Sequence, residues 1–288
     1  MKTLVFGRLG QLGVALADSV PADVELAGFD LPELDITDAT AVRAVCREEA
    51  PSLIVNAAAY TAVDKAETEP ELAMAINCAG PANIAAAARD VGARFVHIST
   101  DFVFDGSVER PYRPDSDTNP ISVYGQTKRA GELAVLERLP ETAVILRTAW
   151  LYSSTGNNFV KTMLRMMDER DEIRVVADQR GTPTWAQSLA TAVWGVAGRP
   201  GVSGMHHWTD DGNATWHEFA LAVQEEALDL GLLRRRIPIW AIATSEYPTQ
   251  ARRPMYSVLD CTVTRAQLGL HVRNWRVNLR LMLQGMID

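Results

Sequence analysis

The chain has few cysteines, no long apolar run and no block of basic residues. Its three cysteines, Cys46, Cys78 and Cys261, are far apart and lack the spacing of a metal site. We therefore expect reduced thiols, as is usual for a cytoplasmic protein, with a structural disulfide as the less favoured alternative. No metal site is predicted.

The other absences argue against membranes and nucleic acids as partners. The first apolar stretch, residues 3–6, ends at Gly7 and Arg8, before the core of a signal peptide could form. No apolar run approaches the roughly 20 residues that cross a bilayer. The 28 basic and 36 acidic residues give a net charge of -8 and are spread along the chain, so no patch that follows a phosphate backbone is expected. We predict a cytoplasmic location.

What the chain does have is a regular alternation of short apolar runs and helical patterns, within 288 residues that are 47% hydrophobic. Strands are expected at 3–7, 24–29, 53–56, 94–98 and 143–146, and helices at 11–19, 38–49, 71–91 and 130–139. Thr37 is expected to cap the second helix. This alternation predicts an α/β fold with a Rossmann-like, doubly wound parallel sheet.

The pattern loosens after Trp150, where turn signals at 156–158, 181–183 and 212–213 separate shorter segments. We expect residues 1–150 to form an NAD(P)-binding domain. Residues 151–288 would form mainly a smaller C-terminal substrate-binding lobe, with some segments returning to the main domain.

The first turn carries Gly7, Gly10 and Gly13, after a strand and before a helix. Glycines let the backbone approach a pyrophosphate, and the helix N-terminus favours its negative charge. Asp30, at the end of the second strand, could accept hydrogen bonds from an adenosine ribose, which favours NADH. Arg8 could instead pair with the 2'-phosphate of NADPH, or could be only a solvated side chain, so the choice of cofactor stays open.

A second pattern, more than a hundred residues later, suits carbonyl reduction. Tyr124 and Lys128 are four residues apart, which places them on one face of a helix. An ammonium near the phenol, together with the positive nicotinamide of the oxidised cofactor, would lower the tyrosine pKa from about 10 toward neutrality. Without the glycine turn, such a pair would more often be an ordinary surface contact.

Hydroxyls are expected beside this pair, because Ser99 and Thr100 follow the fourth strand at the edge where such sheets bind ligands. One of them could hydrogen-bond a substrate carbonyl. The alternative is that they only cap the strand end, a role for which Ser99 is the better candidate. The histidines His206, His207 and His217 are expected to be structural.

With these residues in place, the chain resembles the extended short-chain dehydrogenase/reductases, and within them the dTDP-4-dehydrorhamnose reductase family, over nearly its whole length. The motifs that carry the resemblance are FGRLGQLG at 6–13, NAAAYTAVDKAE at 56–67, STDFVF at 99–104, RTAW at 147–150, GNNF at 156–159 and YPT at 247–249. The resemblance implies NADPH- or NADH-dependent reduction of the C4 keto group of dTDP-4-dehydro-β-L-rhamnose to dTDP-L-rhamnose, with a tyrosine as proton donor.

The resemblance also assigns positions. Catalytic roles would fall on Thr100, Tyr124 and Lys128. The expected cofactor-binding residues are Gly7, Arg8, Gly10, Gln11, Leu12, Asp30, Ala57, Ala58, Ala59, Tyr124 and Lys128. The expected substrate-binding residues are Val63, Asp101, Val103, Tyr124, Trp150, Asn158 and Arg253.

One departure bears on assembly, because some relatives form dimers bridged by Mg²⁺ through glutamates. The matching positions here are Ala15 and Gln187, which offer no carboxylate. A monomer or weak homodimer is therefore expected. Rival readings are a 4-ketoreductase of another dTDP-deoxysugar, a nucleotide-sugar epimerase or dehydratase, and a non-catalytic regulatory subunit of a methionine adenosyltransferase-like enzyme.

Overall fold

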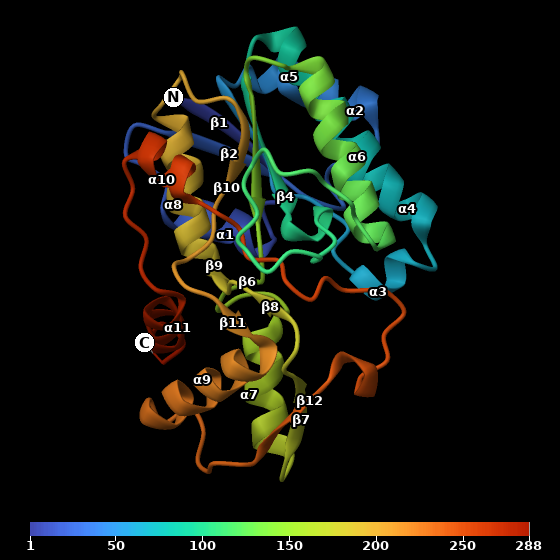
Figure 1. Ribbon diagram of the computed structural model, residues 1–288. Helices are drawn as coiled ribbons and strands as arrows, with labels where there is room; N and C mark the ends of the chain where they lie inside the picture. Colours follow the sequence, from blue (N-terminus) through green and yellow to red (C-terminus); the bar gives the residue numbers. More distant parts are fainter. Residues whose placement is uncertain (288) are drawn as a thin grey trace.

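A six-stranded, wholly parallel sheet forms the centre of the upper lobe in Figure 1, a computed structural model that describes residues 1–287. The strand order is β10-β5-β4-β3-β1-β2. The bounds are β1 (Lys2–Phe6), β2 (Glu25–Phe29), β3 (Leu53–Asn56), β4 (Arg94–Thr100), β5 (Ala143–Thr148) and β10 (Gly204–His207). The predicted doubly wound parallel sheet is confirmed, and five of its strands lie where the sequence predicts them.

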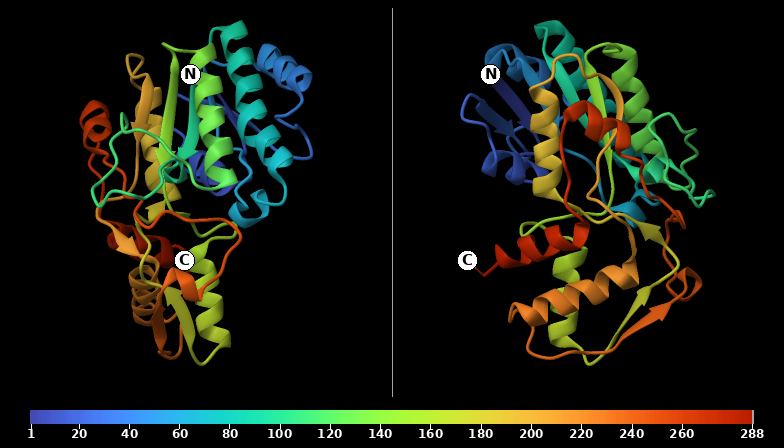
Figure 2. Two further views of the ribbon diagram at one scale, coloured as in Figure 1. Left: turned by 45° about the vertical axis from the view of Figure 1, so that its right-hand side comes forward. Right: turned by 60° about the vertical axis from the view of Figure 1, so that its left-hand side comes forward.

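Helices cover both faces of the sheet, as Figure 2 shows. One face packs against α1 (Gln11–Asp18) and α8 (Ala186–Ala197), with α10 (Thr262–Leu268) beside α8. The other packs against α2 (Ala39–Glu49), α5 (Gly80–Val91) and α6 (Val123–Arg138). Successive strand residues point to opposite faces, so Val5 belongs to the first core and Leu4 and Phe6 to the second.

The sheet changes winding direction at β1, which pairs with β2 on one side and β3 on the other. Ligands of open α/β sheets bind at the carboxyl ends of the strands that flank such a point. The turn at 7–10 follows β1, and residues 57–59 follow β3. The fold therefore places two groups of predicted cofactor residues at one crevice.

A second lobe lies beyond the carboxyl ends of the strands and has its own hydrophobic core (Figure 1). Its helices are α7 (Phe159–Glu169), α9 (Trp216–Asp229) and α11 (Trp275–Gln284). Its paired strands are β6 (Leu151–Tyr152) with β9 (Thr184–Trp185), β7 (Ile173–Val176) with β12 (Ile239–Ile242), and β8 (Arg180–Gly181) with β11 (Ala214–Thr215). Because β10 and α8 join the main sheet and its helices, the upper lobe includes residues from the second half of the chain.

Several local boundaries differ from the expectations. Asp38, not Thr37, caps α2, because its carboxylate accepts the Thr40 and Ala41 N–H groups at 2.9 and 3.0 Å. The long helix expected at 71–91 consists of α4 (Pro70–Met74), a π-helical turn η1 (Ala75–Ala79) and α5. The remaining short elements are α3 (Val63–Ala66), η2 (Asp101–Val103) and η3 (Thr244–Glu246).

The cysteines and the absence of long apolar runs gave two expectations that the described residues bear on. Cys46, Cys78 and Cys261 are free thiols, and Cys46 and Cys261 are buried. Within residues 1–287, none of the helices combines the length and apolar character that crossing a bilayer requires.

Candidate active site

The first turn forms a tight cradle against the segment after β3. Gly7 has φ +87°, a conformation that favours glycine, and a Cβ built on it would lie 2.6 Å from the Ala58 nitrogen. A Cβ on Gly13 would overlap the Gly7 carbonyl oxygen. Helix α1 follows with Gly10 at its N-cap and no side chain capping its first N–H groups. The turn therefore fits a dinucleotide pyrophosphate, with residues 57–58 packed against it.

The end of β2 carries the polar groups expected near an adenosine ribose. Asp30 Oδ2 accepts the Leu9 N–H at 3.0 Å and Oδ1 accepts the Leu31 N–H at 2.9 Å. Each carboxylate oxygen can accept a further hydrogen bond, so Asp30 can hold the turn and still bind a hydroxyl. Arg8 forms an exposed ion pair with Glu33 at 2.9 Å. Both residues thus lie where they could select a cofactor.

Tyr124 is positioned by a close approach of two helical segments. Ser122 caps α6 by accepting the Gly125 N–H at 3.2 Å. Gly125 lies so close to η2 that a Cβ there would overlap the Phe102 carbonyl oxygen. The Phe102 and Tyr124 rings meet edge to face with centroids 5.6 Å apart. The phenol is consequently held beside the end of β4, where Thr100 lies.

Burial raises the pKa of Tyr124 to about 12, although a hydrogen bond with the Thr100 hydroxyl lowers it and the Asp101 charge raises it further. The lowering of this pKa by Lys128 and the oxidised nicotinamide together concerns the complex with cofactor, and it stays a prediction. The Lys128 ammonium donates to the Ile98 carbonyl at 2.7 Å. Tyr124 therefore carries its proton at neutral pH, which is the state that a proton donor requires.

Lys128 is itself strongly affected by burial, being only 2% exposed. Burial lowers its pKa to about 8, while the nearby Glu132 carboxylate opposes the shift. Glu132 accepts two bonds from Arg147, at 2.7 and 2.8 Å, and one from Arg129 at 2.8 Å. This buried network fixes the acid one helical turn beyond Lys128.

Thr100 and Asp101 form a hydrogen-bonded pair at the end of β4. The Thr100 hydroxyl donates to Asp101 Oδ1 at 3.0 Å and accepts the Phe102 N–H at 3.2 Å, so Thr100 performs the capping expected of Ser99. Asp101 is 2% exposed, its Oδ2 has no hydrogen-bond partner among the described residues, and burial raises its pKa to about 6. To donate to a substrate carbonyl, the Thr100 hydroxyl would have to turn away from Asp101.

Three of the predicted substrate residues, Val63, Trp150 and Val103, lie in three different hydrophobic clusters. Val63 packs in the hydrophobic cluster that contains Tyr124. Trp150 has φ +47°, unusual for a large side chain, and its ring stacks on Trp216 with centroids 3.4 Å apart. The Val103 side chain is fully buried against Phe104 and its neighbours, and its contact with the substrate stays a prediction.

The side chain of Asn158 is fully engaged with protein atoms. Its Oδ1 accepts the Lys161 N–H at 3.1 Å and caps α7, while Nδ2 donates to Gln11 Oε1 at 3.0 Å and to the Ser153 carbonyl at 2.7 Å. Both polar groups of the side chain therefore already have protein partners, and its contact with the substrate stays a prediction.

Arg253 also has a protein partner. It forms a two-pronged ion pair with Asp64 at 2.7 and 3.2 Å, and the Asp64 carboxylate also accepts the Ala251 N–H at 3.1 Å. This pair joins α3 to the segment that runs up from the second lobe in Figure 1. Arg253 would reach a substrate phosphate only by sharing or leaving Asp64.

Sequence reasoning missed four residues that organise the site: Asn77, Asp64, Ser153 and Trp216. Asn77 donates to Thr127 Oγ1 at 3.1 Å and exchanges two hydrogen bonds with the Tyr60 backbone. It is one of two asparagines in the alanine-rich stretch 71–91, which was an available signal. The others act through partners far away in the sequence and gave no local signal.

The side chains of the three histidines form hydrogen bonds with other residues of the protein. His206 and His207 lie in β10 and are buried, and His207 Nδ1 is 3.1 Å from the Tyr112 carbonyl. His217 Nε2 lies 3.0 Å from the Ile239 carbonyl. Their predicted structural roles are confirmed. In the part of the chain that the structure describes, no cluster of three or more His, Cys, Asp or Glu side chains is placed to hold a metal ion.

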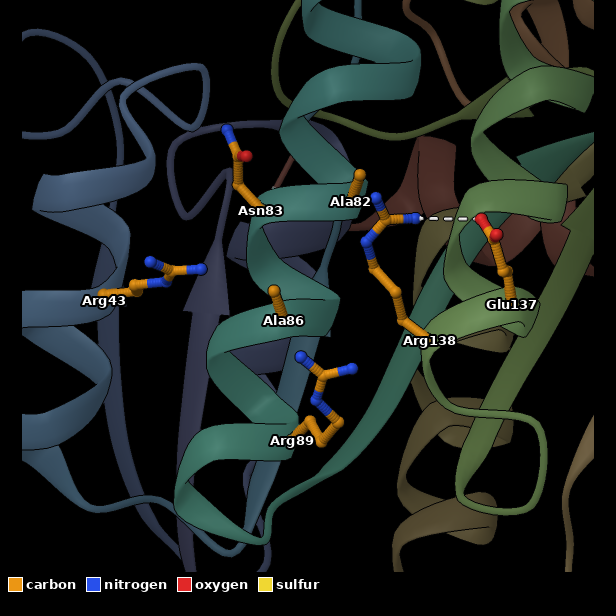
Figure 3. Close-up of a pocket in the computed structure, with 7 residues that line it drawn as sticks. All are labelled: Arg43, Ala82, Asn83, Ala86, Arg89, Glu137 and Arg138. Carbon is orange, nitrogen blue, oxygen red and sulfur yellow. Dashed lines mark hydrogen bonds and ion pairs between the residues drawn. The ribbon is translucent and has the colours of Figure 1, made fainter.

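Two hollows lie away from this site. Figure 3 shows the first, about 480 Å³, where Arg43, Arg89 and Arg138 extend from α2, α5 and α6 around Ala82 and Ala86. The second, about 600 Å³, lies between residues 110–116, 209–213 and 258–265. Neither is lined by a residue that the sequence assigned to the active site.

Comparisons with known proteins agree with this geometry. The family described as "RmlD substrate binding domain" matches residues 1–287. The dTDP-4-dehydrorhamnose reductase of Streptomyces griseus is 46% identical over 284 residues, covering 96% of this chain and 91% of the relative.

Two solved structures of proteins with the same name superpose closely. The one from Clostridium acetobutylicum has a TM-score of 0.94 at 39% identity and covers 100% of both chains. The one from Bacillus anthracis, solved in complex with NADP, has a TM-score of 0.93 at 36% identity and covers 99% of both. The chain therefore belongs to the dTDP-4-dehydrorhamnose reductase family.

Proposed function

We propose that this protein reduces the C4 keto group of dTDP-4-dehydro-β-L-rhamnose to dTDP-L-rhamnose, with NADPH or NADH as the reductant. The single observation that carries the proposal is the placement of Thr100 and the protonated Tyr124 at the same sheet edge as the cradle at Gly7 and Gly13. Family membership supplies the substrate, and the NADP complex of the relative from Bacillus anthracis supports the cofactor.

The bound nicotinamide supplies the hydride, and the chain supplies the remaining requirements. Tyr124 Oη gives its proton to the carbonyl oxygen as negative charge develops there. Thr100 donates a second hydrogen bond to the same oxygen and so orients the carbonyl. Lys128 would hold the nicotinamide ribose, and its positive charge would favour the tyrosinate that remains after proton transfer.

The high pKa of Tyr124 suits this direction of reaction. A phenol with a pKa of about 12 stays protonated throughout the physiological range, so the donor is ready before the substrate arrives. The same pKa makes the tyrosinate costly until positive charge is brought near it. We therefore assign to Lys128, together with the oxidised nicotinamide, the role of offsetting that cost after hydride transfer.

The substrate contacts are proposed in two groups. Val63, Asp101 and Trp150 would line the sugar site, while Arg253 would approach the diphosphate once it shares its Asp64 partner. Asn158 would act indirectly, through the loop that it anchors.

For the assembly and location we propose a cytoplasmic monomer or weak homodimer. Ala15 is 6% exposed and packs in the core under α1, and neither it nor Gln187 offers a carboxylate to a bridging ion. Sedimentation velocity with and without Mg²⁺ tests this. A magnesium-dependent dimer would contradict it.

The central experiment follows NADPH and NADH absorbance with enzymatically generated dTDP-4-dehydro-β-L-rhamnose and identifies the product. Tyr124→Phe should lower kcat by about a hundredfold or more, the usual scale for a general acid, while the cofactor Kd stays unchanged. Full turnover in that variant would refute the role of Tyr124. Turnover only with ketosugars that differ at C3 or C5 would move the assignment to another dTDP-deoxysugar, and cofactor binding with no turnover would favour a regulatory subunit.

A further inference from the structure

One side chain joins the cofactor cradle to the second lobe. Gln11, the first residue of α1, projects its carboxamide into the loop between β6 and α7. Its Oε1 accepts from Asn158 Nδ2 at 3.0 Å and lies 3.1 Å from the Ser153 hydroxyl. Gly156, at φ +67°, lies against the same side chain, since a Cβ there would be 3.2 Å from Gln11 Cγ. We call these contacts of Gln11 with Ser153 and Asn158 the interlobe contact.

Hydrogen-bond accounting fixes the direction of this contact. The Lys161 N–H can be accepted only by an oxygen, so the Asn158 atom that caps α7 is Oδ1 and the other is the NH₂ group. That NH₂ faces Gln11, so the Gln11 atom opposite must be its oxygen. The Gln11 Nε2 donors then have no hydrogen bond within residues 1–287, although they belong to the residue that opens the pyrophosphate-binding helix.

The loop held by the interlobe contact lies between two members of an aromatic cluster in the chain. Trp150 precedes the loop, and Phe159 follows it directly. Both rings meet Trp216, with centroids 3.4 Å away for Trp150 and 4.7 Å away for Phe159. A shift of Asn158 relative to α1 would therefore also move the stacked indole rings, because only a few residues of chain separate Asn158 from the aromatic residues.

We propose that Gln11 is a positioning residue that couples cofactor binding to the shape of the sugar site, an inference that rests on the proposed function. A pyrophosphate bound at the N-terminus of α1 fixes the Gln11 backbone and gives its Nε2 group an acceptor. The fixed carboxamide then holds Asn158 and the loop, which sets Trp150 and Trp216. Cofactor and dTDP-sugar accordingly strengthen each other's binding by the same factor.

Asn158→Asp tests the coupling with little change to the fold. Aspartate keeps the oxygen that caps α7 and suits the positive end of the helix, but it cannot donate to Gln11 Oε1. Isothermal titration of dTDP with and without saturating NADPH needs no turnover. For the wild type we expect NADPH to tighten dTDP binding about 5- to 10-fold, the lower part of the usual range for coupled sites. For Asn158→Asp we expect a ratio near 1 and a somewhat lower melting temperature, because the new carboxylate oxygen also faces the Ser153 carbonyl, which accepts from Asn158 Nδ2 at 2.7 Å in the wild type.

Gln11→Ala completes a double-mutant cycle with Asn158→Asp. If both substitutions break the same contact, the coupling ratio of the double variant equals that of either single variant. A ratio in Asn158→Asp that matches the wild type would overturn the proposal, as would independent losses that add in the double variant. Binding of both ligands without coupling in the wild type would reject the interlobe role alone. Failure of the wild type to bind NADPH or dTDP would reject the proposed function, and the coupling with it.

Discussion

Replacing Lys128 by methionine should make the protein more stable and less active. Burial lowers the pKa of Lys128 from 10.5 to about 8. Each unit corresponds to about 1.4 kcal/mol, so keeping the ammonium charged at pH 7 costs the fold about 3 kcal/mol relative to the neutral form. Methionine has a stem of similar length and carries no charge.

The substitution also removes one favourable contact. The Lys128 ammonium donates to the Ile98 carbonyl at 2.7 Å, and losing a hydrogen bond of a charged group costs about 2 kcal/mol. The two effects leave Lys128→Met more stable than the wild type by about 1 kcal/mol at pH 7. Turnover should fall sharply, because the charge proposed to hold the ribose and favour the tyrosinate is gone.

The dependence on pH is the sharper test. Between pH 8 and 10.5 the unfolded lysine binds more protons than the native one, so the lysine's contribution to wild-type stability rises with pH. The advantage of Lys128→Met over the wild type should therefore shrink by about 2–3 kcal/mol between pH 7 and pH 10, and reverse in sign. Urea unfolding of both proteins at the two pH values measures this difference, in which other titrating groups cancel. A difference that stays constant with pH would refute the reasoning.

Two further substitutions test the cofactor and tyrosine sites. Glu33→Gln frees Arg8 from an exposed ion pair worth at most about 1 kcal/mol, so we expect the KM for NADPH to fall about 2- to 5-fold while that for NADH stays constant in steady-state assays. Equal changes in KM for both cofactors would show that Arg8 does not bind the 2'-phosphate. Gly125→Ala places a methyl group against the Phe102 carbonyl, so we expect the free energy of unfolding, measured with urea, to fall by about 3 kcal/mol. We also expect a lower kcat, because Tyr124 moves away from Thr100. In the control Gly198→Ala the nearest atom is 3.7 Å from the added Cβ, and the substitution should be nearly neutral. Equal stability of the two alanine variants would mean that α6 is not held against η2.

The sheet was predictable because its strands are short apolar runs separated by clear turn signals. Residues 53–56 and 143–148 are buried along their whole length, as expected for strands covered by helices on both faces. The glycine turn was equally clear, since only glycine fits at Gly7 and Gly13 against neighbouring backbone. Both features leave a local signal in the sequence, although the fit at Gly7 also involves the distant segment at 57–58.

The start of α6 and the partner of Lys128 could not be predicted in the same way. Residues 123–126 have little helical tendency, and they are helical because Ser122 caps them and Gly125 packs on η2. The spacing of Tyr124 and Lys128 predicted a shared helix face, but it gave no information on the Ile98 carbonyl, which comes from β4 and takes the ammonium. Such partners depend on tertiary packing.

Burial shifts the pKa values of all three titrating groups of the reacting centre in the direction that reduces charge. It raises the pKa of Asp101 to about 6 and that of Tyr124 to about 12, and it lowers that of Lys128 to about 8. When Tyr124 gives up its proton, the negative charge left on its oxygen therefore lies in a site with little compensating positive charge, in a protein of net charge -8. On the proposed mechanism, Lys128 and the oxidised nicotinamide together supply the compensating positive charge, and we therefore expect proton donation to depend on bound cofactor.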